Sequence, residues 1–360
     1  MRITFFIGGL GNGGAERVVC NLANHLVNHC HEVDILTIGD KESYPIDDRI
    51  NRYKLIQNHE RKNIFLDSCR RMVRLLRYLK KKRDVYIVML PFTTILLLKL
   101  SFLVRGAIIA SERSFPTNYS KSEQQKLKKL AHRADAWVFQ TQAAREWYDK
   151  HLGKAQSIVI SNPINDCFIS EIRVLKRRKI IVTAGRLTEV KNHSLLIRAF
   201  AQIAHEYEDY DLTIYGEGGL LEQLKQEAAN LGIGNKVEFP GFADWGKLSE
   251  DASLFVLSSN LEGMPNSLLE AMALGLPCIS TDCEGGGAAF LIENEKNGLL
   301  VPKNDVDALA NAMRRMLSDS VFAEQCGKNA HDVCYRLAPE KIYEEWEFFI
   351  KEVCSKKEKI

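Results

Sequence analysis

Short apolar runs alternate with longer segments of helical periodicity along most of the chain. Residues 2–7 form the first apolar run, a glycine-rich loop follows, and residues 15–27 repeat apolar side chains at helical spacing. The same order returns at residues 252–277, where an apolar run leads through a loop into a helix with one apolar face. Repeated strand, loop and helix units are typical of parallel α/β sheets. The pattern therefore predicts an α/β fold.

The loop and helix at residues 262–277, EGMPNSLLEAMALGLP, have clear boundary signals. We expect Asn266 to be the N-cap and Ser267 to open the helix, because an Asn side chain can accept a hydrogen bond from the first N–H groups. Gly275 and Pro277 follow in the order that usually ends a helix.

Two acidic residues of this unit suggest a binding site. Glu262 lies in the loop and Glu270 in the first turns of the helix, so both carboxylates can face one crevice at the carboxyl end of the preceding strand. The backbone N–H groups of Gly263, Asn266 and Ser267 would lie between them, at the positive end of the helix dipole. Donors for phosphate together with carboxylates for hydroxyl groups suit a nucleotide sugar.

Residues 185–192, GRLTEVKN, follow a predicted strand at residues 180–184. Gly185 allows a tight turn, and Arg186 and Lys191 place two cations at the carboxyl end of that strand. Two cations in this position indicate a diphosphate.

The first glycine-rich loop supports a different interpretation. Gly9, Gly11 and Gly14 satisfy the G-x-G-x-x-G dinucleotide fingerprint, with Asp34 or Asp40 near the distance of its acidic residue. An NAD(P)-dependent oxidoreductase is therefore an alternative, although it leaves residues 185–192 and 262–277 unexplained.

The length of 360 residues is enough for about two domains. Residues 1–175 carry 28 Lys and Arg against 17 Asp and Glu, whereas the remainder carries 21 against 29. A basic first half indicates an anionic partner or surface. The basic stretch 173–179 is expected to be a linker, which predicts domains at residues 1–172 and 173–338 and a terminal helix at 339–360.

Two predicted helices, at residues 64–83 and 122–133, are strongly basic. Each could pack on a sheet with a solvated basic face, or it could bind anionic lipid head groups. The apolar stretch at residues 93–110 is interrupted by charged residues and is too short to span a membrane.

The nine cysteines are scattered, without a C-x-x-C pair or a preceding secretory signal. We therefore expect a reduced cytoplasmic chain with buried free thiols. Asp305 and Asp307 imitate a D-x-D metal motif, but they precede a predicted helix at residues 308–317, so we expect a capping role. No Ser/His/Asp, Cys/His or metal-ligand arrangement stands out.

The E-x7-E spacing from Glu262 to Glu270, together with GGAER (residues 13–17) and GRLTEVKN, resembles the retaining glycosyltransferases of family 4. The Asn-Pro turn at residues 161–164 matches that family as well, and the resemblance covers essentially the whole chain. It implies the GT-B fold, with two Rossmann-like domains whose parallel sheets face a central cleft. The first domain would bind the acceptor, the second would bind the nucleotide sugar, and the terminal helix would cross back to the first.

The resemblance also implies roles for individual residues. The catalytic group would comprise Arg186, Lys191, Glu262 and Arg113. Glu270 would hold the ribose hydroxyl groups. The remaining donor-binding residues would be Gly14, Gly185, Gly263, Met264, Pro265, Asn266 and Ser267. No metal and no cofactor would be needed.

Two positions depart from the family pattern. Arg113, in the sequence SERS, stands where related enzymes often have a histidine, and it either holds a donor or acceptor oxygen or is a surface arginine. Phe290 stands near a position where the family often has an acidic residue.

The implied activity is the transfer of a hexose or N-acetylhexosamine from a nucleotide sugar, with UDP expected, to a lipid-linked glycan in surface polysaccharide biosynthesis. The acceptor would be carried on a polyprenyl diphosphate, and the product would be α-linked if the donor is. The basic first domain would bind the anionic inner face of the cytoplasmic membrane, and no nucleic acid is expected. A catalytically silent GT-B protein that binds nucleotide sugar or glycan is the second alternative.

Overall fold

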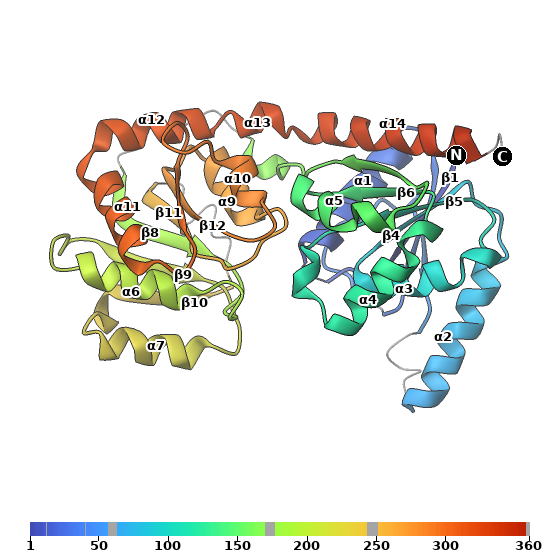
Figure 1. The fold of residues 1–360 in the computed structure, drawn as a ribbon, viewed down its shortest axis with the longest axis horizontal. Coiled ribbons are helices and arrows are strands. Elements are labelled where there is room, and N and C mark those ends of the chain that lie inside the picture. The colour runs from blue at the N-terminus through green and yellow to red at the C-terminus, as the bar shows by residue number, and fades with distance from the viewer. Residues whose placement is uncertain (12, 40, 57–62, 170–176, 243–250, 358–360) are drawn as a thin grey trace. The chain divides into compact units, whose positions relative to one another are not determined.

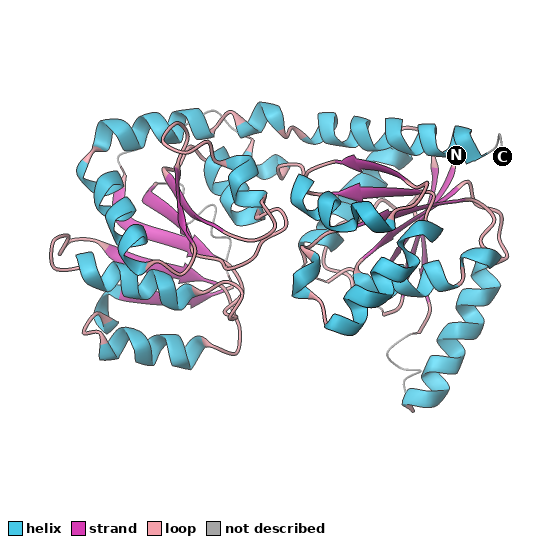
Figure 2. Ribbon diagram, viewed as in Figure 1, coloured by secondary structure: helices cyan, strands magenta, loops and turns pink. Residues whose placement is uncertain are grey.

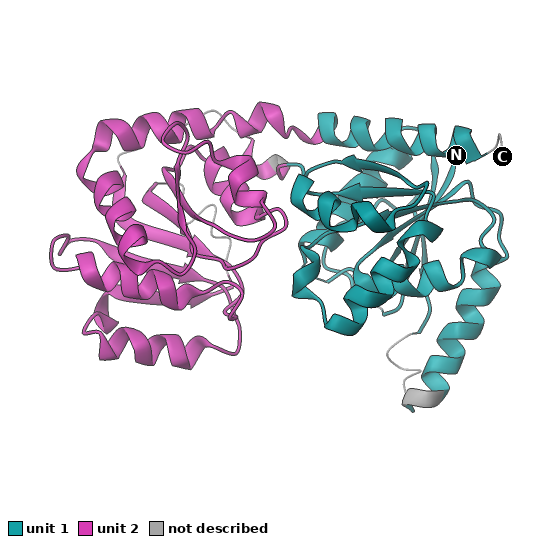
Figure 3. Ribbon diagram, viewed as in Figure 1, with its two compact units in different colours: residues 1–163, 340–360 teal, residues 164–339 magenta. Residues whose placement is uncertain are grey.

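The computed structural model describes residues 1–11, 13–39, 41–56, 63–169, 177–242 and 251–357. The chain divides into two compact units (Figure 3). Unit 1 contains residues 1–163 together with residues 340–360, and unit 2 contains residues 164–339. The C-terminal helix therefore belongs to unit 1 from Glu340 onward.

Unit 1 is built on a seven-stranded parallel sheet with the order β3-β2-β1-β4-β5-β6-β7 (Figure 1). Three of its strands, β4, β5 and β6, are buried along their whole length, as the apolar runs predict for a sheet covered on both faces. The strands are β1 Arg2–Ile7, β2 Glu32–Thr37, β3 Asn51–Lys54, β4 Val85–Met89, β5 Ala107–Ser111, β6 Ala136–Phe139 and β7 Gln156–Val159.

The helices of unit 1 follow the predicted pattern closely. The apolar stripe of α1 is buried, including Val19, Leu22 and Leu26, and Thr141 caps α5 through its side-chain oxygen. The helices are α1 Gly14–Asn28, α2 Ile64–Leu79, α3 Pro91–Lys99, α4 Lys121–Leu130, α5 Gln142–Tyr148 and α14 Pro339–Lys357.

Unit 2 is built on a six-stranded parallel sheet with the order β10-β9-β8-β11-β12-β13. Helices cover both faces (Figure 2), and the larger core cluster joins the sheet to α6, α7 and α11. The strands are β8 Arg178–Ala184, β9 Asp211–Tyr215, β10 Val237–Gly241, β11 Ala252–Leu257, β12 Cys278–Asp282 and β13 Leu299–Pro302. The helices are α6 His193–Ile203, α7 Leu221–Asn230, α9 Asn266–Ala273, α10 Gly287–Leu291, α11 Val306–Ser318, α12 Ser320–Ala330 and α13 Val333–Arg336.

The helix boundaries test three predictions in unit 2. Asn266 is not the N-cap, because α9 already begins at Asn266 and Pro265 holds the capping position in an extended conformation. Gly275 ends this helix as predicted, with a φ of +67° that glycine tolerates. Asp305 caps α11 as predicted, since its Oδ1 accepts from the Ala308 N–H at 2.8 Å.

Both sheets have a topological switch point. In unit 1 the chain builds outward from β1 through β2 to β3 and then returns to place β4 on the other side of β1. Unit 2 does the same with β8, β9, β10 and β11. Ligands of open α/β sheets bind in the crevice outside the carboxyl ends of strands at such points. The β8 and β11 edge of unit 2 is therefore the first place to look for a site.

Two further expectations concern the whole chain. Within the described residues, no helix combines the length and apolar character needed to cross a membrane. All nine cysteines are free, as expected, but Cys30, Cys69 and Cys167 are exposed, so the expectation of buried thiols holds for the other six only.

Candidate functional site at the β8 and β11 edge

The loops that follow β8 and β11 are joined to one another. The Asn260 N–H donates to the Val190 carbonyl oxygen at 2.8 Å, and the Ser258 hydroxyl donates to the Lys191 carbonyl oxygen at 3.2 Å. The Asn192 side chain adds a 3.0 Å hydrogen bond to the Asn260 side chain. These contacts bring the two sequence motifs, residues 185–192 and 262–277, to a single place.

An ion pair between Lys191 and Glu262 lies at this place. The side chains retain 17% and 11% of their exposure, so the pair is largely desolvated and still reachable. Glu262 Oε1 also accepts from the Ser259 hydroxyl at 2.7 Å, and the Thr281 hydroxyl donates to the Ser259 carbonyl oxygen at 2.6 Å. The ammonium and carboxylate groups are thus held by a network that reaches the neighbouring strand β12.

Glycines let the surrounding loops approach one another. A Cβ at Gly216 would lie 2.0 Å from the Gly185 carbonyl oxygen, and a Cβ at Gly287 would lie 1.7 Å from the Gly263 carbonyl oxygen. Any side chain at Gly216 or Gly287 would therefore push the loops apart. Gly185 itself faces the Lys191 side chain, since its Cβ would lie 3.4 Å from the Lys191 Cδ.

The loop before α9 supplies most of the predicted donor-binding residues. Met264 is buried, and Gly263 and Pro265 pack against the start of α10 through Gly287. Asn266 and Ser267 belong to the first turn of α9. The N–H groups in the first turn of any α-helix have no carbonyl acceptor within the helix itself. Glu270 is buried in the next turn.

Arg186 differs from the other charged residues of this edge. Its side chain is exposed, and it has no hydrogen bond or ion pair within the described part of the chain. It is therefore a cation at the carboxyl end of β8 that remains available to an anionic ligand.

His193 is a residue of this edge that the sequence reasoning missed. It opens α6 directly after the K-N pair, it is buried, and neither ring nitrogen has a hydrogen-bond partner within the described residues. Burial, with a further contribution from the charge of Lys191, lowers the pKa of His193 to about 4. The ring is therefore neutral at physiological pH. Its position next to the K-N sequence at a helix start is the signal that could have identified it.

In unit 1, Gly14 is the exposed first residue of α1, after the glycine loop of β1. The acidic residue required by the dinucleotide interpretation is already used inside the unit. Asp34 is fully buried, and its carboxylate accepts from Tyr78, Arg83 and Asn51. It is not available for a ribose hydroxyl, and Asp40 lies outside the described residues.

Arg113 is not a surface arginine. It is buried at the end of β5, and its guanidinium donates to Asn162 Oδ1, which also accepts from Gln140 Nε2 at 2.7 Å. Burial lowers the pKa of Arg113 to about 10. The neighbouring Glu112 is buried as well, and burial raises its pKa, although hydrogen bonds from Tyr119 and Tyr148 oppose that shift. Unit 1 thus places a buried polar network at the ends of β5, β6 and β7, in which Arg113 Nε and Gln140 Oε1 have no hydrogen-bond partner within the described residues.

The predicted residues therefore fall into two groups. Unit 2 brings together Gly185, Arg186, Lys191, Glu262 and the residues from Gly263 to Glu270, whereas Gly14 and Arg113 belong to separate loops of unit 1. Phe290, in α10, is 42% exposed, and its carbonyl oxygen accepts from Arg336 Nη2 at 3.2 Å.

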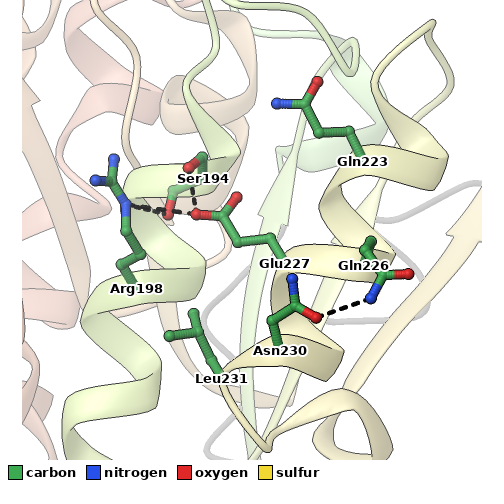
Figure 4. A pocket seen from close by; sticks show the side chains of 7 residues that line it. All are labelled: Ser194, Arg198, Gln223, Gln226, Glu227, Asn230 and Leu231. Atoms are coloured by element: carbon green, nitrogen blue, oxygen red, sulfur yellow. Dashed lines mark hydrogen bonds and ion pairs between the residues drawn. The ribbon is translucent and has the colours of Figure 1, made fainter.

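A surface hollow between α6 and α7 lies apart from these residues (Figure 4). Its charged groups already pair, since Glu227 Oε1 accepts from the Ser194 hydroxyl at 2.7 Å and lies 3.5 Å from Arg198 Nε. It contains none of the predicted site residues. Its lining is Ser194, Arg198, Gln223, Gln226, Glu227, Asn230 and Leu231.

Two parallel-sheet domains, one with charged groups at its switch point, fit the GT-B fold of glycosyltransferases, and the comparisons agree. A family model described as Glycosyltransferase Family 4 matches residues 12–167, and one described as Glycosyl transferases group 1 matches residues 168–333. The two matches are consecutive and together cover most of the chain. The chain therefore belongs to the group 1 and family 4 glycosyltransferases.

Individual relatives match over nearly their whole length. An uncharacterized glycosyltransferase of Haemophilus influenzae is 27% identical over 96% of this chain and 98% of its own length. A Campylobacter jejuni enzyme is 29% identical over 98% of this chain and 99% of its own length. It is named GalNAc-alpha-(1->4)-GalNAc-alpha-(1->3)-diNAcBac-PP-undecaprenol alpha-1,4-N-acetyl-D-galactosaminyltransferase.

Among solved structures, Anabaena HepE in complex with UDP and glucose matches with a TM-score of 0.81 at 19% identity. The match covers 98% of this chain and 100% of that chain. At this identity the likeness concerns the fold, which is GT-B as predicted. The family and the fold expected from the sequence are both confirmed.

Proposed function

We propose that this protein is a retaining glycosyltransferase that moves a hexose or N-acetylhexosamine from a UDP-sugar to a lipid-linked glycan in bacterial surface polysaccharide synthesis. The Campylobacter relative is named for such an acceptor, and Anabaena HepE binds UDP and glucose. A retaining reaction gives an α-linked product from an α-linked donor. The proposal assigns the nucleotide sugar to unit 2 and the acceptor to unit 1.

The Lys191–Glu262 pair at the switch point of unit 2 is the observation that carries this proposal. The anomeric C–O bond to the diphosphate breaks as the bond to the acceptor oxygen forms, so negative charge grows on the leaving diphosphate. The acceptor hydroxyl group would give its proton to an oxygen of that diphosphate. Lys191 and Arg186 are cations at the edge where that charge would develop, and preorganised charges stabilise a transition state without further rearrangement. Lys191 would exchange its Glu262 partner for a phosphate oxygen, and Glu262 would then hold a sugar hydroxyl.

The start of α9 supplies the remaining contacts in this proposal. The backbone N–H groups of Asn266 and Ser267, in the first turn of α9, lie at the positive end of the helix dipole, which favours an anion. Glu270 would accept from the ribose hydroxyl groups, and the glycine loop at Gly14 would close on the diphosphate. Arg113 would act on a sugar oxygen only after leaving Asn162. No metal ion takes part in this scheme.

A thermal-shift panel with UDP, GDP, ADP and NADH, each without and with magnesium, tests the donor assignment. Millimolar ligand at a micromolar site stabilises a protein by about 4 kcal/mol, so a shift with UDP alone and without magnesium is expected. The Glu270→Ala variant should lose that shift while unfolding at the same temperature as wild type without ligand. A shift with NADH alone would refute the proposal.

If UDP raises the unfolding temperature, the next experiment is a transfer assay with UDP-sugars and a glycan acceptor on a polyprenyl diphosphate. Nuclear magnetic resonance of the product reports its anomeric configuration, and a β-linked product from an α-linked donor would refute the retaining mechanism. Tight UDP binding with neither transfer nor donor hydrolysis would favour the silent binding protein.

We further propose that α2 binds the anionic membrane surface that carries the acceptor. Its inner face packs through Leu75, Tyr78 and Leu79, whereas Leu66 and Val73 remain 51% and 53% exposed on the outside. The four side chains at positions 66, 70, 73 and 77 follow helical spacing and read Leu, Arg, Val and Arg. An outward face that mixes apolar and cationic side chains suits the interface of an anionic bilayer. Figure 1 shows α2 reaching beyond the sheet of unit 1.

Cosedimentation with vesicles tests this surface. Val73→Asp should weaken binding to vesicles containing phosphatidylglycerol about tenfold, because it removes apolar area and adds a repelled charge. The matched control is Val321→Asp, on α12 of unit 2, where valine is 78% exposed. Equal losses in both variants, or binding to neutral vesicles alone, would contradict the proposal.

A further inference from the structure

Two histidines and one glutamate from opposite ends of the chain converge in unit 1. His25 lies in the last turn of α1, His29 is the C-cap residue that follows this helix, and Glu347 comes from α14. One ligand atom from each lies within 4.8 Å of the other two. Among the described residues, this is the one group of three or more His, Cys, Asp and Glu side chains with such spacing.

The distances fit a small metal ion. Glu347 Oε2 lies 2.7 Å from His29 Nδ1 and 3.7 Å from His25 Nε2. Ligand atoms of a tetrahedral zinc site, at about 2.0 Å from the ion, are roughly 3.3 Å apart, so small side-chain movements would complete the geometry. The His25 Nε2 atom is buried, has no hydrogen-bond partner within the described residues, and lies on the side of the ring that is nearest to Glu347 Oε2.

The second oxygen of Glu347 is held by other groups. Glu347 Oε1 lies 3.1 Å from His31 Nε2 and 2.5 Å from Lys351 Nζ. These contacts fix the carboxylate so that Oε2 faces His25 and His29. In metal sites, neighbouring hydrogen-bond donors often hold one oxygen of a carboxylate while the other oxygen binds the ion.

The surroundings favour a cation. His25 and His29 lie in and just after the last turn of α1, where the helix dipole is negative, and Glu340 and Glu344 add negative charge near His25. Lys351 is the opposing cation, but it contacts Oε1 and not Oε2. Imidazole nitrogens with one carboxylate are a donor set for zinc, whereas magnesium and calcium prefer oxygen ligands alone.

We propose that His25, His29 and Glu347 bind one zinc ion that ties the C-terminal helix α14 to α1. The site lies at the amino edge of the sheet, because α1 starts at the carboxyl end of β1 and runs back to the start of β2. Gly14 and Arg113 belong to the opposite edge. The ion would therefore join the two helices and take no part in the sugar transfer proposed above, and with three protein ligands its fourth position would be left to water.

Zinc titration of the full-length protein tests this site. The protein is prepared without a histidine tag, stripped with a chelator, and titrated with zinc chloride against a chromophoric competitor. We expect one zinc ion per chain, an affinity at least tenfold weaker in His29→Gln and in Glu347→Gln, and no competition from millimolar magnesium. His29 is 44% exposed, so its replacement tests the ligand without disturbing the core. The control is His205→Gln, at a side chain that is 77% exposed in unit 2.

Cobalt substitution separates this site from the exposed cysteines. Cobalt bound to nitrogen and oxygen ligands lacks the near-ultraviolet charge-transfer band of a thiolate complex, so a strong band that Cys30→Ser removes would overturn the proposal. Zinc should also slow hydrogen exchange in α14 of wild type and not in His29→Gln. UDP affinity should be the same with and without zinc, so failure of the zinc site and failure of the donor site are distinguishable. Unchanged zinc affinity in both ligand variants would refute the site.

Discussion

The carboxyl edges of the two parallel sheets differ in how exposed their charged side chains are and in how those side chains are paired. In unit 2, the edge at β8 and β11 holds the Lys191–Glu262 pair, which is partly exposed, and the exposed cation Arg186. In unit 1, the edge at β5, β6 and β7 holds Glu112 and Arg113, which are buried and bonded to Tyr119, Tyr148 and Asn162. The edge at β5, β6 and β7 lies beside the β1 and β4 switch point of unit 1 and not at it, and its charged side chains are already paired. The edge at β8 and β11 is therefore the better placed of the two to receive a charged ligand.

Physical chemistry explains why the difference matters. A charge that is exchangeable with a ligand must be desolvated enough to interact strongly and must still be reachable. The pair in unit 2 meets both conditions. In the network of unit 1, Glu112 and Asn162 already accept hydrogen bonds from Tyr119, Tyr148, Arg113 and Gln140, so binding to these groups would first require breaking internal hydrogen bonds. We therefore expect unit 2 to bind the nucleotide and unit 1 to contribute shape and a few specific contacts.

The largest expected effect is that of Lys191→Ala. Removing the ammonium takes away stabilisation of the leaving diphosphate, and transfer should fall on the order of 100-fold or more. The measurement is the initial rate of sugar transfer at saturating donor. Transfer rates within a few-fold of wild type would remove Lys191 from the site.

The control for this variant lies on the same strand. Lys179, near the amino end of β8, forms an exposed ion pair with Asp209. Lys179→Ala removes a lysine ion pair from the opposite edge, so it should leave transfer unchanged and cost little stability. If both variants lost the same amount of transfer activity, Lys191 would affect transfer through the stability of unit 2 and not through the leaving diphosphate.

The next effect concerns pH and His193. The pKa of His193 is lowered to about 4 by burial, against an ordinary value of 6.5. Its contribution to stability is therefore complete above pH 6.5 and is lost as the pH falls through 4, because the unfolded chain binds the proton first. The shift corresponds to about 3 kcal/mol.

Comparison with His193→Leu isolates this contribution. The wild type should lose about 3 kcal/mol more unfolding free energy than the variant between pH 7 and pH 3.5, measured by denaturant unfolding. Other titrating groups cancel in the difference. Parallel pH profiles for the two proteins would show that His193 is not a buried neutral ring.

Several helices and strands show how much of the fold could be predicted from the sequence. Strong periodicity predicted α1, α2, α11 and α14, and buried apolar runs predicted most strands. β3, Asn51–Lys54, was missed because it is a short edge strand of polar and partly exposed residues. The helix start at Asn266 was misplaced by one residue, because Pro265 in an extended conformation took the capping position.

The candidate site was predictable to a similar extent. The motifs predicted Lys191 and Glu262 separately, but their direct pairing depends on the register of β8 against β11. The burial of Arg113 could not be read from SERS, since its partner Asn162 comes from another strand end. The group of His25, His29 and Glu347 was missed for the same reason, because 318 residues separate His29 from Glu347.

The smallest expected effect concerns the buried polar network around Arg113 in unit 1. Arg113→Met removes the guanidinium that donates to Asn162 and leaves Gln140 as the one remaining side-chain donor to Asn162 Oδ1 within the described residues. Leaving buried polar groups with fewer partners costs roughly 1–3 kcal/mol, so the unfolding midpoint should fall. The dissociation constant for UDP should stay within twofold of wild type, because the proposed function assigns the nucleotide to unit 2. Calorimetric titration with UDP and denaturant unfolding of the same preparation measure both quantities. A tenfold loss of UDP affinity without loss of stability would mean that Arg113 contacts the donor directly and that its hydrogen bond to Asn162 does not stabilise unit 1.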